Sequence, residues 1–245
     1  MPKVRINKFI ASSGICSRRE ADELIEKGKV KVNGKIITEL GFSVDDKKDK
    51  VEVEGKLIRS VKLDYYKFYK PAGYITTSDD EKGRKTIYDL LPENLYHLKP
   101  VGRLDKDSTG LIILTNDGEL INQLTHPSVK VPKVYLVSVN SKISRKDLEA
   151  ISQGVEIEKG KIAYADITVL EMNSSATTMR ITLFQGLNRQ IRKMFEHFGY
   201  EVKSLKRIQH ATITLDGMHR GEFKQLKPKN VKELKSYLSK AENND

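Results

Sequence analysis

VGRLDKDSTGLIILTNDG, residues 101–118, contains the strongest fold signals in this chain. The apolar run Leu111–Leu114 lies between Gly110 and the turn sequence NDG, which is typical of a buried strand between two turns. Three acidic residues surround this strand in an otherwise basic chain: Asp105, Asp107 and Asp117. The stretch therefore raises the question of whether one of these carboxylates is chemically active or whether all of them solvate turns.

Similar apolar runs elsewhere end at Gly, Asn, Ser or Pro, namely YYKFYKPAGYITT, KVYLVSVN, ADITVLEM and TTMRITLFQG. They predict an extended, mixed and mainly antiparallel sheet. Helices are expected at about 119–125, 144–153 and 188–198, the second of them capped by Ser144 and closed by Gly154. The fold class of this larger part is therefore α+β, with helices flanking the sheet.

The first 60 residues have a different pattern. The sequence SRRE at 17–20 is a capping box and predicts a helix start, and a short helix over about 5–12 precedes it. Asn33-Gly34 lies between alternating apolar and polar residues and predicts a tight hairpin. We therefore expect a small domain at 1–60, a larger domain at 61–235 and a polar tail at 236–245.

The composition limits the function classes. The chain has 44 Lys and Arg against 33 Asp and Glu, a net charge of +11, which predicts a polyanionic partner such as nucleic acid or an anionic membrane surface. It has no apolar run of the length that a membrane span or a secretory signal requires, so we expect a cytoplasmic protein. The single cysteine, Cys16, and five scattered histidines give no metal-ligand spacing, and we expect no metal.

Basic residues concentrate at the N-terminal helices, where residues 3–35 carry nine Lys and Arg against four acids. A helix start adds backbone amides to such a surface, so these side chains could clamp RNA phosphates. The alternative is a merely solvated face. The candidates are Arg5, Lys8, Arg18, Arg19, Lys27 and Lys29.

The stretch GLNRQIRKMFEHFGYEV predicts an amphipathic helix. One face is apolar and suits the core, whereas the other is basic and faces either solvent or an anionic partner. The basic face carries Arg189, Arg192 and Lys193, which are candidate RNA-binding residues.

Residue chemistry alone leaves the acidic residues partly undecided. Asp105 follows Arg103, and a carboxylate beside a guanidinium stays ionised, whereas a general acid needs its pKa raised by burial. A nucleophilic or electrostatic role is therefore better supported than acid catalysis, but Asp105 and Asp107 cannot be distinguished, and a plain turn role stays open. Asp117 lies in turn chemistry and is assigned no catalytic part.

Two resemblances sharpen this interpretation. RINKFIASSGICSRREADELIEKGKVKVNGK is similar to the S4-type RNA-binding module. GRLDKDSTGLIILTNDGEL, YKPAGYITT, PKVYLVSV and GLNRQIRKM resemble the RsuA family of bacterial rRNA pseudouridine synthases, which includes the RluB, RluE and RluF types. The resemblance implies an S4-type domain followed by a pseudouridine synthase domain that isomerises uridine in ribosomal RNA, without a cofactor or a metal.

Site residues carry over motif by motif. The resemblance implies that Asp105 is the catalytic aspartate, that Tyr135 stacks on the target base and is a candidate for proton removal, and that Arg192 pairs with Asp105. Arg103 resembles the residue that holds the base out of its helix, and Leu205 packs beneath the base. The sequence Lys70-Pro71 matches a structural motif beside the site.

The substrate is less well determined by the sequence. DDEKGRKTIYDLLPE and THPSVKVPKVYLV resemble the RluB type, and QGLNRQIRKMFEHFGYEV resembles the RluF type. Both types act on the large ribosomal RNA, so 23S rRNA is the expected substrate. A 16S rRNA synthase of the RsuA type is the alternative. A non-catalytic RNA-binding assembly factor is a further alternative, and a monomer is expected in each case.

Overall fold

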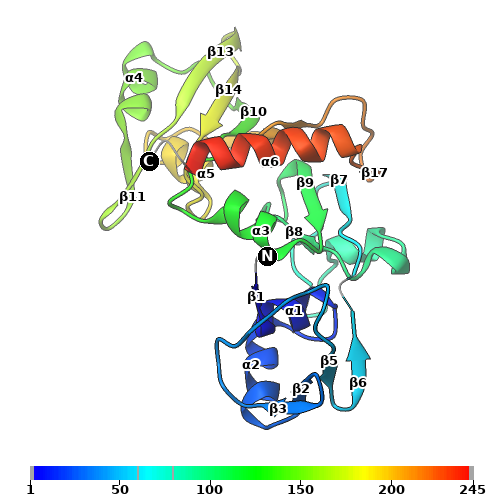
Figure 1. Cartoon of the computed structure of the whole chain (residues 1–245). Coiled ribbons are helices and arrows are strands. Elements are labelled where there is room, and N and C mark those ends of the chain that lie inside the picture. The colour runs from blue at the N-terminus through cyan, green and yellow to red at the C-terminus, as the bar shows by residue number, and fades with distance from the viewer. Residues whose placement is uncertain (1–2, 60, 79, 243–245) are drawn as a thin grey trace. The chain divides into compact units, whose positions relative to one another are not determined.

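The computed structural model describes residues 3–59, 61–78 and 80–242. The chain divides into two compact units, Met1–Asp64 with Asn116–Gly118, and Tyr65–Thr115 with Glu119–Asp245 (Figure 1). Ser60, where a domain boundary is expected, lies outside the described residues. No helix within those described ranges is long and apolar enough to cross a membrane.

The N-terminal unit combines helices and short strands around a small core. Ser17 and Glu20 form the expected capping box at the start of the helix Arg18–Glu26. Asn33 and Gly34 both have positive φ, 50° and 82°, as a type I′ hairpin turn requires, so the predicted hairpin is confirmed. Its elements are β1 (Val4–Arg5), α1 (Ile6–Ser12), α2 (Arg18–Glu26), β2 (Val30–Val32), β3 (Lys35–Ile37), β4 (Ser43–Val44), β5 (Val51–Val53) and β6 (Lys56–Ile58).

The C-terminal unit is built, within the described residues, on a nine-stranded sheet with the path β13-β14-β10-β15-β9-β7-β17, to which β16 and β8 add at β15 and β9. The β9–β15 pair is parallel and the other neighbours along the path run antiparallel, which confirms the mixed, mainly antiparallel sheet. The strands are β7 (Tyr65–Lys70), β8 (Lys99–Pro100), β9 (Thr109–Thr115), β10 (Lys133–Val139), β13 (Asp166–Met172), β14 (Thr177–Leu183), β15 (Val202–His210), β16 (Ile213–Thr214) and β17 (Phe223–Gln225).

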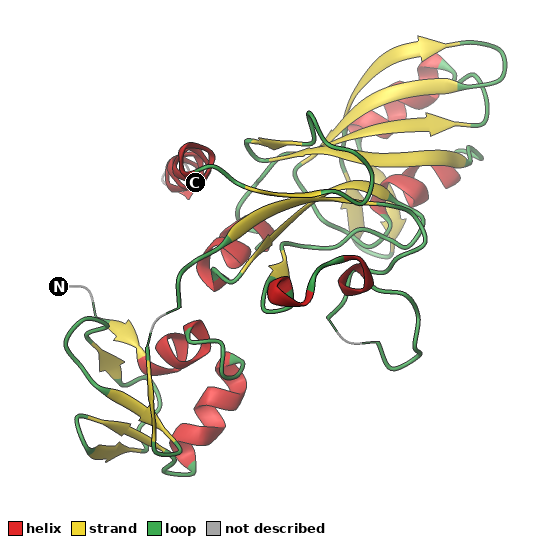
Figure 2. Ribbon diagram, turned by 90° about the vertical axis from the view of Figure 1, so that its right-hand side faces the viewer, coloured by secondary structure: helices red, strands yellow, loops and turns green. Residues whose placement is uncertain are grey.

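Helices and a small hairpin accompany this sheet (Figure 2). The hairpin β11–β12 packs beside α4 and α5. The elements are the 3-10 helices Ile87–Leu90 and Glu93–Leu95, the hairpin strands β11 (Val155–Glu158) and β12 (Lys161–Ala163), and the helices α3 (Gly118–Thr125), α4 (Arg145–Gln153), α5 (Gln190–Glu196) and α6 (Pro228–Glu242). The expected helices are thus present, but α5 is shorter than 188–198.

Strand β9 is buried on both faces, which explains its continuous apolar run. Ile112 and Leu114 belong to one core cluster, which also contains the apolar face of α5. Leu111 and Ile113 belong to a second cluster on the opposite side, with residues of α3 and α6. The sheet is therefore covered on both sides at β9, the strand that directly follows the Asp105 loop.

The expected polar tail is wrong for residues 236–242, because α6 continues through them. Leu234 and Leu238 are one helical turn apart, and both are completely buried in the second core cluster. Two apolar side chains in a lysine-rich stretch are enough to place a helix against the sheet when they share one face. Residues 243–245 lie outside the described part of the chain.

Candidate functional site

A cavity of about 510 Å³ opens in the C-terminal unit, within the range of small-ligand sites. Its walls come from the 102–108 loop, from β10 and β15, and from the 183–189 segment with the start of α5. It brings together five of the residues selected from the sequence, namely Arg103, Asp105, Tyr135, Arg189 and Leu205. Asp107 is exposed and does not line the cavity, so the structure separates the two carboxylates that residue chemistry left undecided.

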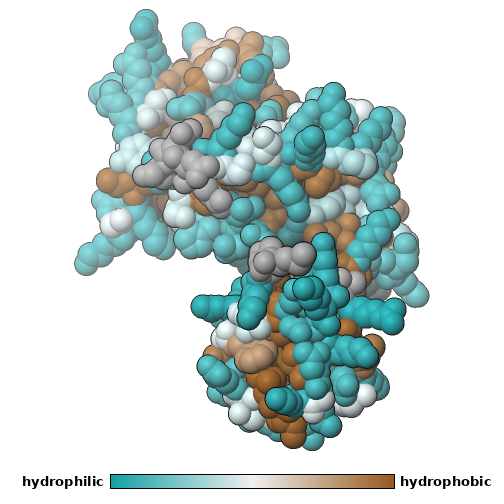
Figure 3. Space-filling model, in the orientation of Figure 1, coloured by the Kyte–Doolittle hydropathy of each residue, from teal (hydrophilic) through white to brown (hydrophobic). Residues whose placement is uncertain are grey.

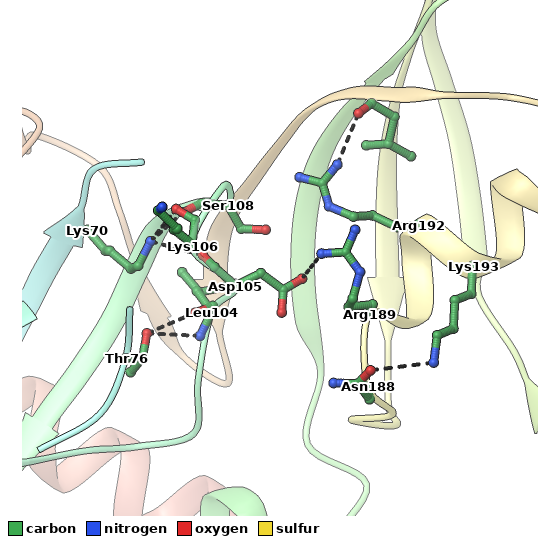
Figure 4. Close-up of polar contacts among 11 residues, drawn as sticks. Lys70, Thr76, Leu104, Asp105, Lys106, Ser108, Asn188, Arg189, Arg192 and Lys193 are labelled. Atoms are coloured by element: carbon green, nitrogen blue, oxygen red, sulfur yellow. Dashed lines mark hydrogen bonds and ion pairs between the residues drawn. The ribbon is translucent and has the colours of Figure 1, made fainter. Parts of the chain in front are cut away.

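The loop that carries Asp105 is held by a buried lysine. Lys70 is completely buried at the end of β7, and its Nζ lies 3.1, 3.0, 3.3 and 2.8 Å from the carbonyl oxygens of Pro71, Asp105, Lys106 and Ser108 (Figure 4). An ammonium has only N–H donors, so it suits a ring of carbonyls. Burial lowers the pKa of Lys70 to about 8, against the opposing effect of Asp105 and Asp107.

A threonine fixes the other side of the same loop. The Thr76 hydroxyl donates to the carbonyl of Leu104 at 3.0 Å and accepts from the amide of Leu104 at 3.2 Å. Thr76 and Leu104 are both buried, so water does not compete for these bonds. The backbone on both sides of Asp105 is thus restrained, and its carboxylate is presented to the cavity from a fixed loop.

The cation beside Asp105 is Arg189. Its Nη1 lies 3.7 Å from Asp105 Oδ2, and Figure 4 shows the two side chains pointing toward each other. Both are partly exposed, 45% for Arg189 and 32% for Asp105, so solvent screens the pair. Arg189 precedes α5 and has a left-handed φ of 50°, which directs its side chain away from the helix and toward the loop.

The expected pairing of Arg192 with Asp105 is wrong in this structure. Arg192 Nη1 donates to the carbonyl of Val202 at 3.0 Å, whereas the ion pair drawn to Asp105 comes from Arg189 (Figure 4). Arg192 lies inside α5, where side chains lean toward the N-terminal end of the helix, and this places it over the start of β15. Arg189, expected only as an RNA-binding residue, therefore holds the position beside Asp105 that is expected for Arg192.

Tyr135 and Leu205 share one face of the strand pair β10–β15. Tyr135 pairs with Arg207 across the strands, and Val137 pairs with Leu205. Tyr135 and Leu205 are each 8% exposed, so only a small part of each side chain reaches the cavity. This face offers an aromatic ring and an aliphatic side chain side by side, which is a surface suited to a flat base.

The sequence interpretation missed three residues on the same face. Lys133, Arg207 and His210 line the cavity with Tyr135, and Lys133 lies opposite His210 across the strands. Side chains two positions apart on a strand share a face, so Lys133 lies on the face of Tyr135 and Arg207 lies on the face of Leu205. Lys133 and Arg207 could therefore have been predicted from the sequence. His210 could not be found in this way, because a register shift between Val134 and Tyr135 breaks the alternation.

The remaining basic candidates lie outside the cavity. Lys193 forms an ion pair with Glu158, and hydrogen bonds from Lys161 and Lys193 lower the pKa of Glu158 to about 2. In the N-terminal unit Lys8 is half-buried. Much of the surface visible in Figure 3 is hydrophilic, with apolar patches between the hydrophilic side chains. The exposed basic candidates of that unit are Arg5, Arg18, Arg19, Lys27 and Lys29. Their binding of RNA stays a prediction.

Comparisons with known proteins agree with the two-unit architecture. Residues 4–60 match the S4 domain family, and residues 64–197 match the RNA pseudouridylate synthase family. In the described ranges no group of three or more His, Cys, Asp or Glu side chains could hold a metal ion.

Two curated relatives and one solved structure are similar over most of the chain. Ribosomal large subunit pseudouridine synthase B of Bacillus subtilis is 41% identical over 98% of both chains. Dual-specificity RNA pseudouridine synthase RluF of Escherichia coli is 42% identical over 91% of this chain and 75% of its own length. A crystal structure of a pseudouridylate synthase covers 94% of this chain and 99% of its own, with a TM-score of 0.66 and 26% identity.

Proposed function

The chain belongs to the RNA pseudouridylate synthase family, and we propose that it converts a uridine of large-subunit ribosomal RNA to pseudouridine, with Asp105 as the catalytic residue. The observation that carries the proposal is the Asp105 carboxylate, which faces a cavity of about 510 Å³ from a loop held by Lys70 and Thr76. The large-subunit substrate is supported by the similarity to the Bacillus subtilis enzyme, whose name assigns it to the large ribosomal subunit.

The isomerisation of uridine needs an ionised carboxylate, and Asp105 supplies one at the cavity. The bond between N1 of uracil and C1′ of ribose breaks, the ring turns, and a bond forms between C5 and C1′, after which C5 loses a proton and N1 carries one. Atoms and electrons balance within the nucleotide, so the isomerisation requires no oxidant or reductant. An ionised carboxylate can act on ribose C1′ or the base as a nucleophile, or can assist by deprotonating the sugar, and these routes stay open.

The neighbouring side chains have separate roles in the proposal. Arg189 is a positioning residue, because its guanidinium lies beside Asp105 and favours the ionised carboxylate in that orientation. Tyr135 stacks on the uracil and is the candidate for removing the C5 proton, and Leu205 packs beneath the ring. Arg103 is exposed at the cavity and occupies the space that the uridine leaves in its helix.

Uridine has to leave its stack to reach Asp105, which costs a few kcal/mol. Stacking on Tyr135 offsets part of this cost. The S4 unit adds phosphate contacts that do not depend on the base sequence, through its exposed arginines and lysines. The proposal includes a monomer as the working unit and the cytoplasm as its location, since ribosomal RNA is the substrate.

The test maps pseudouridines in both ribosomal RNAs by carbodiimide modification. Cells lacking the gene are compared with cells complemented by the wild type or by Asp105→Asn. We expect one large-subunit position to lose its pseudouridine on deletion and to regain it only with the wild type. A changed position in small-subunit RNA would support the small-subunit alternative. Full activity of Asp105→Asn would remove the catalytic role of this aspartate, and RNA binding without any changed position would support the non-catalytic alternative.

A further inference from the structure

One wall of the cavity carries basic side chains for which the proposed chemistry has no use. Lys133 and His210 are cross-strand partners on β10 and β15, and Arg207 is the cross-strand partner of Tyr135. Side chains at directly opposed positions have Cβ atoms about 4.5–5.5 Å apart. Arg207 is 2% exposed and His210 is 1% exposed, so this basic cluster, Lys133, Arg207 and His210, is part of the interior wall beside Tyr135.

Polar atoms of this wall lack partners within the described residues. Arg207 Nε donates to the carbonyl of Leu111 at 2.7 Å, but its Nη2 has no hydrogen bond. Both ring nitrogens of His210 and the hydroxyl of Ser108 are also buried without a hydrogen bond of acceptable geometry. Buried polar groups nearly always have partners. Arg207 and His210 on this wall and Ser108 on the adjoining loop all line the cavity, which is therefore complementary to a ligand that can accept hydrogen bonds.

The charge of the wall indicates an anion. Among the described residues that line the cavity, Asp105 is the one carboxylate, and Arg189 lies beside it at 3.7 Å. Lys133 Nζ donates to the carbonyl of Val131 at 3.2 Å, which leaves its charge without an acidic partner in the cavity wall. A uracil ring offers carbonyl oxygens but no charge, so the base alone would satisfy the hydrogen bonds and leave the two cations uncompensated.

Burial also favours the neutral forms of Lys133 and His210 when no anion is bound. Burial lowers the pKa of Lys133 to about 8, and the charge of Arg207 acts in the same direction. Burial holds the pKa of His210 well below its ordinary value, with Arg207 and Lys133 adding to the effect and the Leu124 carbonyl opposing it. A bound anion would reverse these effects by compensating the charge.

We propose that Lys133, Arg207 and His210 bind one phosphate group of the RNA, next to the uridine that enters the cavity. The inference rests on the proposed function, because the phosphate belongs to the nucleotide that reacts at Asp105 or to its direct neighbour. Arginine and lysine are the side chains that recognise phosphate through charge-assisted hydrogen bonds. The basic cluster then holds the RNA backbone while Tyr135 holds the base, and the extruded nucleotide is fixed at both ends.

The experiment measures how RNA binding depends on salt. The full-length protein and its Lys133→Met variant bind a large-subunit rRNA transcript over a series of salt concentrations. Loss of one phosphate contact lowers the slope of log K against log salt by about 0.7 for single-stranded RNA. We expect this reduction in Lys133→Met, and we expect the wild-type slope in Lys206→Met, which removes the same charge from the opposite face of β15.

The outcomes separate this inference from the proposed function. An unchanged slope in Lys133→Met overturns the proposed site for an RNA phosphate, and this is also the result expected if the cluster binds only free phosphate. The same reduction of the slope in Lys206→Met overturns it as well. Lys133→Gln, which keeps a polar end, carries the same expectation if the methionine variant does not fold. The proposed function fails in a different way, when the wild type forms no pseudouridine in the transcript whatever the slopes are.

Discussion

Gly110 is the position at which the structure makes its most quantitative prediction. Gly110 lies between Lys70 on β7 and Arg207 on β15, at the parallel pairing that follows the Asp105 loop. A Cβ added here would lie 2.2 Å from the carbonyl oxygen and 2.6 Å from the nitrogen of Arg207. Both are backbone atoms in a paired strand, so no side-chain rotation relieves the contact.

Two costs add in Gly110→Ala. The φ of +111° is unfavourable for an L residue, and left-handed backbone costs roughly 1–2 kcal/mol. The contact with Arg207 in addition requires β9 and β15 to separate, which breaks the pairing at Gly110. Most substitutions cost about 0.5–3 kcal/mol, and we expect this one to exceed about 4 kcal/mol. That corresponds to a loss of roughly 8–16 °C in the melting temperature of a domain of this size.

The assay is differential scanning calorimetry of the wild type, Gly110→Ala and Gly73→Ala. Gly73 also has a positive φ, +93°, but nothing lies within 4 Å of an added Cβ, so its variant measures the backbone cost alone. We expect a loss of roughly 2–8 °C for Gly73→Ala, from the same conversion. Equal melting temperatures of the two variants would refute the close approach of β9 and β15.

Three further predictions concern the site and a fourth the C-terminal helix. Arg189→Gln should lower kcat/KM about fivefold and leave the melting temperature unchanged. The reason is that a solvent-screened ion pair near 4 Å has a Coulomb energy of about 1 kcal/mol. A lower melting temperature or unchanged activity would contradict this. Arg192→Gln should instead lower the melting temperature, because Val202 loses its charged donor. The pH profile of kcat/KM should fall above about pH 8 as Lys70 loses its proton and one N–H donor, and activity constant to pH 10 would disprove its role in holding the loop. Leu238→Ala should cost about 2–5 kcal/mol in denaturant unfolding, whereas a residue of a free tail would cost nothing.

Local sequence is sufficient for the features that depend on neighbours a few residues apart. The capping box of Ser17 and Glu20 spans three positions, and the Asn33-Gly34 turn needs only two residues with positive φ. The apolar run Leu111–Leu114 indicates a strand buried on both faces, and short-range alternation locates β10. These signals were sufficient for the α+β class and the two-part organisation, because propensity and periodicity act over a few residues.

The family motifs add the catalytic candidate to this local information. They select Asp105 in preference to Asp107, which residue chemistry alone could not do, and the cavity contains the selected carboxylate. The motif could not determine which arginine lies beside it. Arg189 lies just before α5 and has a left-handed backbone, so the helix begins only at Gln190. Nothing in the local sequence predicts this backbone conformation.

Features that need strands from distant parts of the chain follow only from the assembled fold. Lys70 contacts the carbonyl of Ser108 only because β7 pairs with β9, and Arg207 reaches the cavity only because β15 lies between β9 and β10. Leu238 likewise becomes part of the core only when the sheet offers it an apolar face. Strand order and register are determined by many weak contacts between distant parts of the chain. A pattern within a few neighbouring residues contains no information about the total energy of those contacts.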